Sequence, residues 1–229
     1  SLTGISTNNP SQVNAGTYIN AVSGIAPNYQ LTRVDGVLTI EKAALTVSAS
    51  NQTRTYGNNN PSLAYDLSGF VGGDSVGNVA IVGSPVLTTA AVNSSNVGTY
   101  PISVASVAGM TSNNYNFSAG SNSGTLTIDR RPISVMASNV TRTYGDPNPV
   151  LTYTVTGLYG ADVLNGALAT TAAPSTNVVN APVAITQGDL TNLYNPNYNI
   201  ANFTAGNLTI TPAVLSYIAT PITVTEGTL

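Results

Sequence analysis

Three short stretches of the chain alternate apolar and polar residues in a shared pattern. They begin at Leu45 (Leu-Thr-Val-Ser-Ala), Ile133 (Ile-Ser-Val-Met-Ala) and Leu215 (Leu-Ser-Tyr-Ile-Ala). A period of two places successive side chains on opposite faces of an extended backbone, so each stretch is predicted to be a half-buried β-strand. No apolar pattern with helical spacing extends over ten or more residues. The chain is therefore predicted to be mostly β.

Each of these strands is followed by a related polar motif. Asn51–Gly57 reads Asn-Gln-Thr-Arg-Thr-Tyr-Gly, and Asn139–Gly145, 88 residues later, reads Asn-Val-Thr-Arg-Thr-Tyr-Gly. A degraded copy, Pro221–Gly227, has Glu226 in the position of the tyrosine. Repetition at a fixed spacing indicates tandem copies of one β-rich unit.

The end of each unit also recurs. Three predicted closing strands share the pattern Gly-x-Leu-Thr-Ile, at Gly36–Ile40, Gly124–Ile128 and Gly206–Ile210, and a short polar step follows each of them. These steps serve as predicted boundaries. They divide the chain into the C-terminal part of a truncated repeat (1–43), two complete repeats (44–131 and 132–213) and the opening strand of a further repeat (214–229).

A second turn motif lies inside each complete repeat. Gly69–Asp74 (Gly-Phe-Val-Gly-Gly-Asp) matches Gly157–Asp162 (Gly-Leu-Tyr-Gly-Ala-Asp). Because Asp is a good N-cap residue, we expect Asp74 and Asp162 each to begin a short helical turn, at 74–78 and 162–165.

The order of these motifs resembles that of the MBG ("mostly β-grasp") repeats of large bacterial adhesins, many of which are similar to filamentous haemagglutinins that leave the cell by two-partner secretion. The resemblance covers essentially the whole chain. It departs from the pattern at Val179–Ala181, which replaces the Gly98-Thr-Tyr100 of the preceding repeat, and at Glu226. It implies end-to-end β-grasp-like domains, each with at most one short helix; immunoglobulin-like β-sandwich repeats are the alternative.

The recurring motif residues are interpreted as structural, because recurrence in every unit favours a role in the fold. They are Thr53, Tyr56, Gly57, Gly69, Asp74, Gly98, Tyr100, Tyr115, Gly124, Thr141, Tyr144, Gly145, Gly157, Asp162, Tyr198 and Gly206. The tyrosines are expected to cover the core of each unit. Arg54 and Arg142 are expected to lay their aliphatic stems along a sheet and to keep their guanidinium groups in water. A weaker alternative is that Arg54, Arg142, Tyr56 and Tyr144 contact a glycan.

Composition limits the chemistry that this chain can perform. Its 229 residues include no His and no Cys, which excludes Ser-His-Asp triads, Cys nucleophiles and typical zinc sites. The few acids are scattered, and we expect neither enzymatic activity nor a cofactor or metal, calcium included. A formal net charge of −3 offers no basic field for nucleic acid, and no apolar run has the length of a membrane span.

These observations favour a structural function. We expect a stalk or spacer segment of a secreted or surface-anchored bacterial adhesin, located outside the cell and supporting cell adhesion and biofilm formation. Its expected partners are the neighbouring repeats of the same chain and, besides them, extracellular polysaccharide or a host or cell surface. Two alternatives remain open: a carbohydrate-binding module with shallow sites on each repeat, and head-to-tail self-association in which the strand near Leu215 completes another chain.

Overall fold

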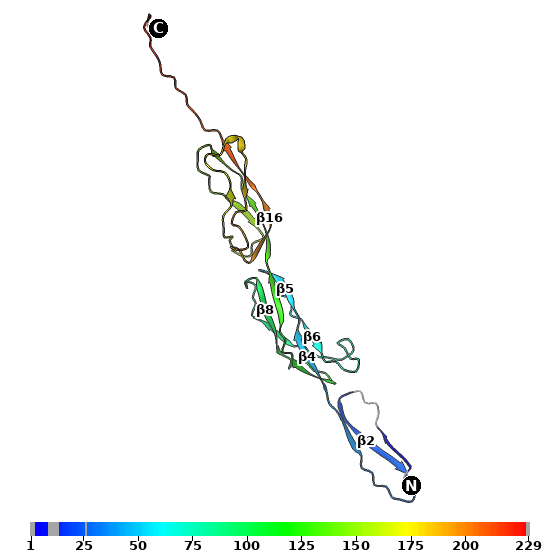
Figure 1. Ribbon diagram of the computed structural model, residues 1–229. Helices are drawn as coiled ribbons and strands as arrows, with labels where there is room; N and C mark the ends of the chain where they lie inside the picture. The colour runs from blue at the N-terminus through cyan, green and yellow to red at the C-terminus, as the bar shows by residue number, and fades with distance from the viewer. Residues whose placement is uncertain (1–2, 9–13, 26, 228–229) are drawn as a thin grey trace. The chain divides into compact units, whose positions relative to one another are not determined.

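A computed structural model describes residues 3–8, 14–25 and 27–227 (Figure 1). The contacts divide the chain into two compact units. The first unit comprises Ser1–Arg54 and Asn58–Ile128, and the second comprises Thr55–Gly57 and Asp129–Leu229. The short segment that contains the first Tyr-Gly motif thus packs within the second unit.

The first unit begins with a three-stranded antiparallel sheet of order β1-β2-β3. Its strands are β1 (Thr3–Asn8), β2 (Gly16–Ile25) and β3 (Gly36–Ile40). The predicted closing strand at Gly36–Ile40 is therefore present, and it pairs with β2 from Gly16↔Ile40 to Asn20↔Gly36.

Two further sheets follow in the order of the first complete repeat. One has the order β6-β4-β9 and consists of β4 (Ala43–Ala49), β6 (Tyr65–Ser68) and β9 (Tyr115–Ala119). Its central strand β4 runs antiparallel to β6 and parallel to β9. The other sheet has the order β5-β10-β8-β7 and consists of β5 (Gln52–Thr55), β7 (Val86–Thr89), β8 (Gly98–Ser106) and β10 (Gly124–Asp129).

The second unit repeats both sheets. The three-stranded sheet has the order β13-β11-β16 and consists of β11 (Arg131–Ala137), β13 (Tyr153–Thr156) and β16 (Tyr198–Thr204). The four-stranded sheet has the order β12-β17-β15-β14 and consists of β12 (Val140–Thr143), β14 (Ala169–Thr170), β15 (Val183–Thr186) and β17 (Gly206–Thr211). A 3-10 turn, η1 (Val178–Asn180), precedes β15. The two sets of strands therefore share one topology.

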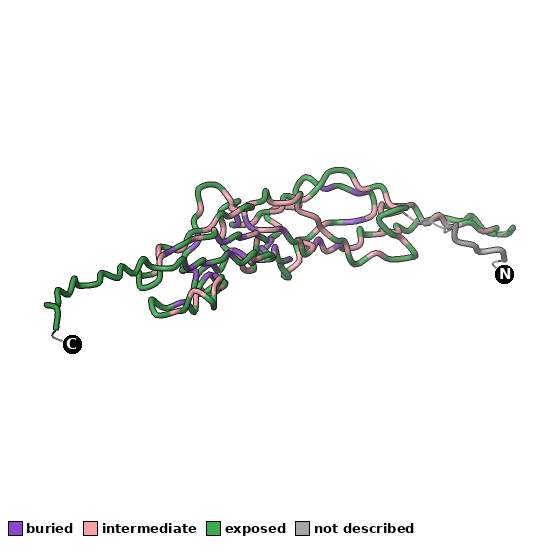
Figure 2. The backbone as a smooth tube through the Cα atoms, turned by 90° about the horizontal axis from the view of Figure 1, so that it is seen from above, coloured by how far each residue is buried: buried purple, intermediate pink, exposed green. Residues whose placement is uncertain are grey.

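The core of each unit follows from the alternation seen in the sequence. In β4 the buried residues are Leu45 and Val47, and in β11 they are Ile133, Val135 and Ala137. The closing strands contribute Leu126 and Ile128 in the first unit and Leu208 and Ile210 in the second. Figure 2 shows the buried residues in purple, with exposed residues between and around them. In each unit the sheet around β4 or β11 and the four-stranded sheet thus both supply side chains to the core.

The predicted mostly-β architecture with repeated sheet units is confirmed. The predicted helical turns at 74–78 and 162–165 are wrong, because these segments form turns and loops without helix. The carboxylates of Asp74 and Asp162 do not cap a helix; they accept hydrogen bonds from tyrosine hydroxyl groups.

The predicted opening strand at Leu215–Ala219 is also not formed. Residues 212–225 have no strand assignment, and every residue from 212 to 227 is exposed (Figure 2). A strand needs a neighbouring strand to satisfy its backbone hydrogen bonds, and no described strand pairs with this segment.

Candidate functional site: the Asp162 cluster

The Tyr-Gly segment lies against three residues of the second unit, Tyr159, Asp162 and Tyr198; with Tyr56 they form what we call the Asp162 cluster. The ring of Tyr56 makes edge-to-face contacts with Tyr159 and Tyr198, at centroid distances of 5.6 and 5.5 Å. Its hydroxyl donates a hydrogen bond to Oδ2 of Asp162 at 3.0 Å. Edge-to-face packing is the favoured geometry for aromatic pairs. Tyr56 thus makes both aromatic and polar contacts within the cluster.

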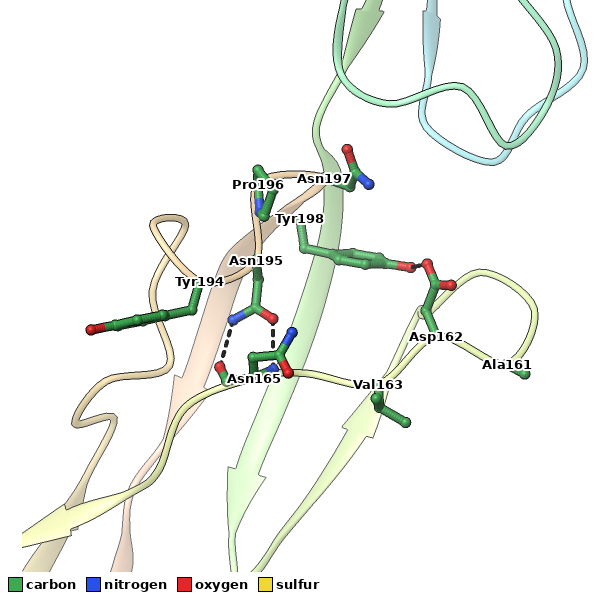
Figure 3. A pocket seen from close by; sticks show the side chains of 9 residues that line it. All are labelled: Ala161, Asp162, Val163, Asn165, Tyr194, Asn195, Pro196, Asn197 and Tyr198. Carbon is green, nitrogen blue, oxygen red and sulfur yellow. Dashed lines mark hydrogen bonds between the residues drawn. The ribbon is translucent and has the colours of Figure 1, made fainter.

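Asp162 accepts hydrogen bonds from two tyrosines at once. The Tyr198 hydroxyl donates to the same Oδ2 atom, and the backbone N–H of Tyr159 donates to the Tyr198 hydroxyl oxygen at 3.1 Å. Figure 3 shows the Tyr198 hydroxyl pointing at the Asp162 carboxylate. Tyr56 and Tyr198 are 6% and 4% exposed. The carboxylate therefore satisfies two phenol groups that have little access to water.

The first unit contains the matching pair of Asp74 and Tyr115, which we call the Asp74 pair. The Tyr115 hydroxyl donates to Oδ2 of Asp74 at 2.6 Å, and the backbone N–H of Val71 donates to the Tyr115 hydroxyl oxygen at 3.2 Å. Phe70 packs edge-to-face on Tyr115 at 5.7 Å. The motif Asp and the motif Tyr of each repeat are therefore brought together, although the sequence reading assigned them separate roles.

The glycine of the Tyr-Gly motif is required by close packing in the first copy. Gly57 has φ +81°, and a Cβ atom there would lie 2.5 Å from Cγ of Tyr159. Gly145 has a similar φ of +92°, with open space around it. Both loops thus share one backbone conformation, which L residues rarely adopt, and only the first is packed against aromatic side chains.

Burial and the shared carboxylate change the ionisation of these tyrosines. Burial, assisted by the hydrogen bond to Asp162, raises the pKa of Tyr198 to about 12. Burial is also the main cause that raises the pKa of Tyr56, followed by its hydrogen bond to Asp162. For Tyr115, the hydrogen bond to Asp74 is the largest of the causes that raise the pKa. A neighbouring carboxylate and removal from water both favour the neutral phenol.

We expect an alkaline titration to show these shifts. Because the pKa of Tyr198 is raised above the ordinary value of about 10, its contribution to stability is complete below pH ~10 and is lost as the pH rises through about 12. The phenolate absorbance should therefore include a tyrosine that ionises near pH 12. Tyr198→Phe should remove this late component, and loss of an ordinary component near pH ~10 instead would contradict the assignment.

A cavity of about 390 Å³ lies beside Asp162 and is lined by residues of two loops of the second unit (Figure 3). Asn195, which is 5% exposed, joins these loops. Its Oδ1 accepts a hydrogen bond from the Asn165 N–H and its Nδ2 donates to the Asn165 carbonyl oxygen, both at 2.8 Å. The polar groups of Asn195 and Asp162 thus form hydrogen bonds within the protein, and those of Asn195 hold the two loops together.

Arg54 and Arg142 occupy a second recurring polar cluster, and the prediction that their heads lie in water is wrong. They are 7% and 6% exposed. Arg54 donates to Oδ1 of Asn60 at 2.7 Å and to the carbonyl oxygen of Val92 at 2.6 Å. Such buried guanidinium groups hold the loops in place through hydrogen bonds to their carbonyl oxygens. They are poorly placed to contact a glycan.

The same arrangement holds Arg142, whose donors reach Oδ1 of Asn148 at 2.8 Å and the carbonyl oxygens of Thr143 and Ala173. Asn60 and Asn148 were not predicted from the sequence to have a role. Each lies six residues after its arginine and donates through Nδ2 at 2.7 Å to a loop carbonyl oxygen, that of Ala91 or Ala172. The identical Arg–Asn spacing in both repeats is the sequence feature that could have predicted these contacts.

The other motif residues lie in strands or turns. Thr53 and Thr141 are exposed in β5 and β12. Gly98 and Tyr100 lie in β8, and the Tyr100 hydroxyl donates to the Asn96 carbonyl oxygen at 2.9 Å. Gly124 and Gly206 begin β10 and β17, whereas Gly69 and Gly157 follow β6 and β13. Tyr144 is 40% exposed and is the most accessible of the four residues considered for glycan contact.

Within residues 3–8, 14–25 and 27–227, no group of three or more His, Cys, Asp or Glu side chains is placed to hold a metal ion. No helix in the described part of the chain is both long enough and apolar enough to span a membrane.

Comparison with known families agrees with the repeated topology. The family model of the MBG domain (YGX type) matches residues 45–127 and 133–209, which together make up more than half of the chain. A search of curated proteins finds no match. The Tyr-Gly dipeptides at Tyr56 and Tyr144 lie inside these two matched regions. The chain therefore belongs to the MBG domain family, with two tandem copies of the YGX-type domain.

Proposed function

We propose that this chain is a spacer segment of a bacterial surface adhesin, exposed outside the cell, in which tandem MBG domains hold an adhesive region away from the surface. The observation that carries the proposal is the tandem repetition of one β domain, because MBG repeats are typical of bacterial surface proteins. Adhesion to cells or to biofilm matrix would then be specified by other parts of the adhesin.

The polar groups of the two recurring clusters support this function. Arg54, Arg142, Asp74 and Asp162 all direct their hydrogen bonds to partners within the protein. Such pairing stabilises loops and leaves few strong polar groups free to bind a small molecule. A spacer requires stable loops more than it requires a reactive site.

The division of the chain into units gives further support. Each unit has its own buried strands, and the connection from β10 to β11 is a single residue, Arg130. Short connections between repeats restrict the freedom of neighbouring domains. An array of such domains would project over a distance that grows with the number of repeats.

Small-angle X-ray scattering over a concentration series tests the spacer proposal. A compact globule of this length would have a radius of gyration of about 17 Å. We expect a clearly larger value, a distance distribution typical of an elongated particle, and no change with concentration. A value near that of the globule would contradict the proposal, and growth with concentration would favour the self-association alternative.

A carbohydrate-binding module stays a prediction with less support. Of its four candidate residues, Tyr56, Arg54 and Arg142 are buried, which leaves Tyr144 as the accessible aromatic. If the chain binds a glycan weakly and Tyr144→Ala abolishes this binding, the result would support the carbohydrate-binding alternative.

A further inference from the structure

The two repeats differ in the loop that leads into the buried motif tyrosine. Met110 and Leu190 are buried at matching positions, and the N–H of each donates to the carbonyl oxygen three residues earlier. Four residues separate Met110 from Tyr115, whereas seven separate Leu190 from Tyr198, so the loop of the second unit is three residues longer. Binding residues are often carried on loops that a rigid scaffold positions, which makes the longer loop a candidate for a function of its own.

The longer loop places two apolar side chains at the surface. Residues 191–197 read Thr-Asn-Leu-Tyr-Asn-Pro-Asn, and Leu193 and Tyr194 are 81% and 51% exposed. The shorter loop, residues 111–114, reads Thr-Ser-Asn-Asn and has no aromatic residue. Tyr194 therefore occurs in one copy only and contributes little to the core. An aromatic side chain that the fold does not require is available for recognition.

Hydrogen bonds fix the shape of the longer loop. The Thr191 carbonyl oxygen accepts from the backbone N–H groups of Tyr194 and Asn195, at 3.2 and 3.1 Å, and from Nδ2 of Asn195 at 3.2 Å. The Tyr198 N–H donates to the Asn195 carbonyl oxygen at 3.0 Å, which joins the loop to β16. Asn195 also binds both backbone groups of Asn165 on the second loop. Because the loop is held in this way, little conformational freedom would be lost when a ligand binds.

Tyr194 lines the cavity of about 390 Å³ beside Asp162. Figure 3 shows Tyr194 and Asp162 on opposite sides of the contact between Asn195 and Asn165. Asn165 is exposed and lines the same cavity, and its side-chain amide makes no hydrogen bond to any described residue. Oδ1 of Asp162 likewise accepts none within the described part of the chain, since both phenols donate to Oδ2. The cavity thus offers an aromatic ring, an amide and a carboxylate oxygen.

This combination matches the chemistry of a neutral sugar. A pyranose ring has a face of C–H groups, which packs on the electron-rich face of an aromatic ring. Its hydroxyl groups both donate and accept hydrogen bonds, as the Asn165 amide does, and they can donate to a carboxylate. The cavity volume lies near the lower end of the range of small-molecule sites, about 300–1,000 Å³.

The charge of the cavity argues against an anionic sugar. Among the described residues that line it, Asp162 is the one charged residue. Arg130 donates to the Pro196 carbonyl oxygen at 3.1 Å but does not line the cavity. A ligand carboxylate would therefore meet the like charge of Asp162 without a cation beside it.

We propose that the cavity between Tyr194 and Asp162 binds a neutral oligosaccharide. One sugar ring packs on Tyr194, and hydroxyl groups of the ligand bind the Asn165 amide and donate to Oδ1 of Asp162. The longer loop places this site in the second unit, and it uses none of the four residues considered above for glycan contact. It gives the segment a binding activity that goes beyond that of a spacer.

Saturation-transfer NMR on the whole chain tests the site with maltotriose, cellotriose and chitotriose as neutral probes and trigalacturonate as an anionic probe. We expect transfer to the ring C–H protons of at least one neutral probe and none to trigalacturonate. Tyr194→Ala should weaken this binding by about tenfold or more, because the ring contact is lost. Tyr194→Phe keeps the ring and should retain binding. Tyr144→Ala removes another exposed tyrosine of the same unit and should bind like the original chain.

Asn165→Ala is a second variant, which should weaken binding by about threefold to tenfold. It removes the side-chain amide and keeps the backbone groups that bind Asn195. Because Tyr194 and Asn165 are both exposed, these variants should fold, and circular dichroism checks that they do.

Three results would overturn the proposal: no transfer to any neutral probe, transfer to trigalacturonate alone, or equal binding by Tyr194→Ala and the original chain. Loss of binding in Tyr144→Ala with Tyr194→Ala unaffected would also contradict it. Small-angle scattering tests the spacer function separately, so a failure to bind these probes contradicts only this site.

Discussion

Replacing Leu208 by Ala should lower the free energy of unfolding of the second unit by about 2–5 kcal/mol. Leu208 lies in β17, the strand that pairs with both β12 and β15, and its side chain is 0% exposed. Truncation removes apolar contacts and leaves a cavity that the two flanking strands cannot easily fill. Chemical denaturation followed by tyrosine fluorescence measures this loss.

Thr209→Ala is the matched control for Leu208→Ala. Thr209 is the next residue of β17, but it points to the exposed face of the same sheet. We expect a change within ~0.5 kcal/mol of the original protein. Equal effects of the two substitutions would show that the alternation in β17 does not define the core.

Replacing Asp162 by Asn should also destabilise the second unit, by about 2–4 kcal/mol. The Asp162 carboxylate accepts hydrogen bonds from the hydroxyl groups of Tyr56 and Tyr198, both of which are nearly buried. Asn keeps the shape but removes the charge. Both hydroxyl groups donate to the same carboxylate oxygen, so each would exchange a charged acceptor for a weaker neutral one.

Asp189→Asn provides the charge-matched control in the same unit. Asp189 is exposed, and its backbone N–H donates to the Ala167 carbonyl oxygen in either variant. We expect no more than ~0.5 kcal/mol of change in the free energy of unfolding. A similar loss in both variants would indicate a general effect of net charge rather than the two tyrosine contacts.

The strands were the most predictable part of the structure. The alternation at Leu45 and Ile133 and the Gly-x-Leu-Thr-Ile pattern all correspond to strands, because a half-buried strand imposes a period of two on its own sequence. The run at Leu215 has the same pattern and forms no strand. An alternating pattern makes a segment suitable for a β-strand. The strand forms only where a second strand pairs with it, and the local sequence does not determine whether one does.

Local reasoning failed for the polar motif residues for a related reason. Asp74 and Asp162 end matching turn motifs in a position suited to a helix cap, and their actual partners, Tyr115 and Tyr198, are 41 and 36 residues away. Arginine is usually an exposed residue. The guanidinium groups of Arg54 and Arg142 are nevertheless buried, because they donate hydrogen bonds to loop carbonyl groups and Asn side chains. Recurrence identified these residues as important to the fold, and only the tertiary structure shows what each one binds.

A double-mutant cycle between Tyr56→Phe and Asp162→Asn tests the central claim most directly, namely that the tyrosine of the first Tyr-Gly motif helps to hold the second unit together. The free energy of unfolding of the second unit is measured for the original chain, both single variants and the double variant. We expect a coupling of about 1–2 kcal/mol, because Tyr56→Phe removes this hydrogen bond and Asp162→Asn replaces its charged acceptor with a neutral one. Additive effects would show that the Tyr56 hydroxyl contributes nothing through Asp162 and would contradict the account.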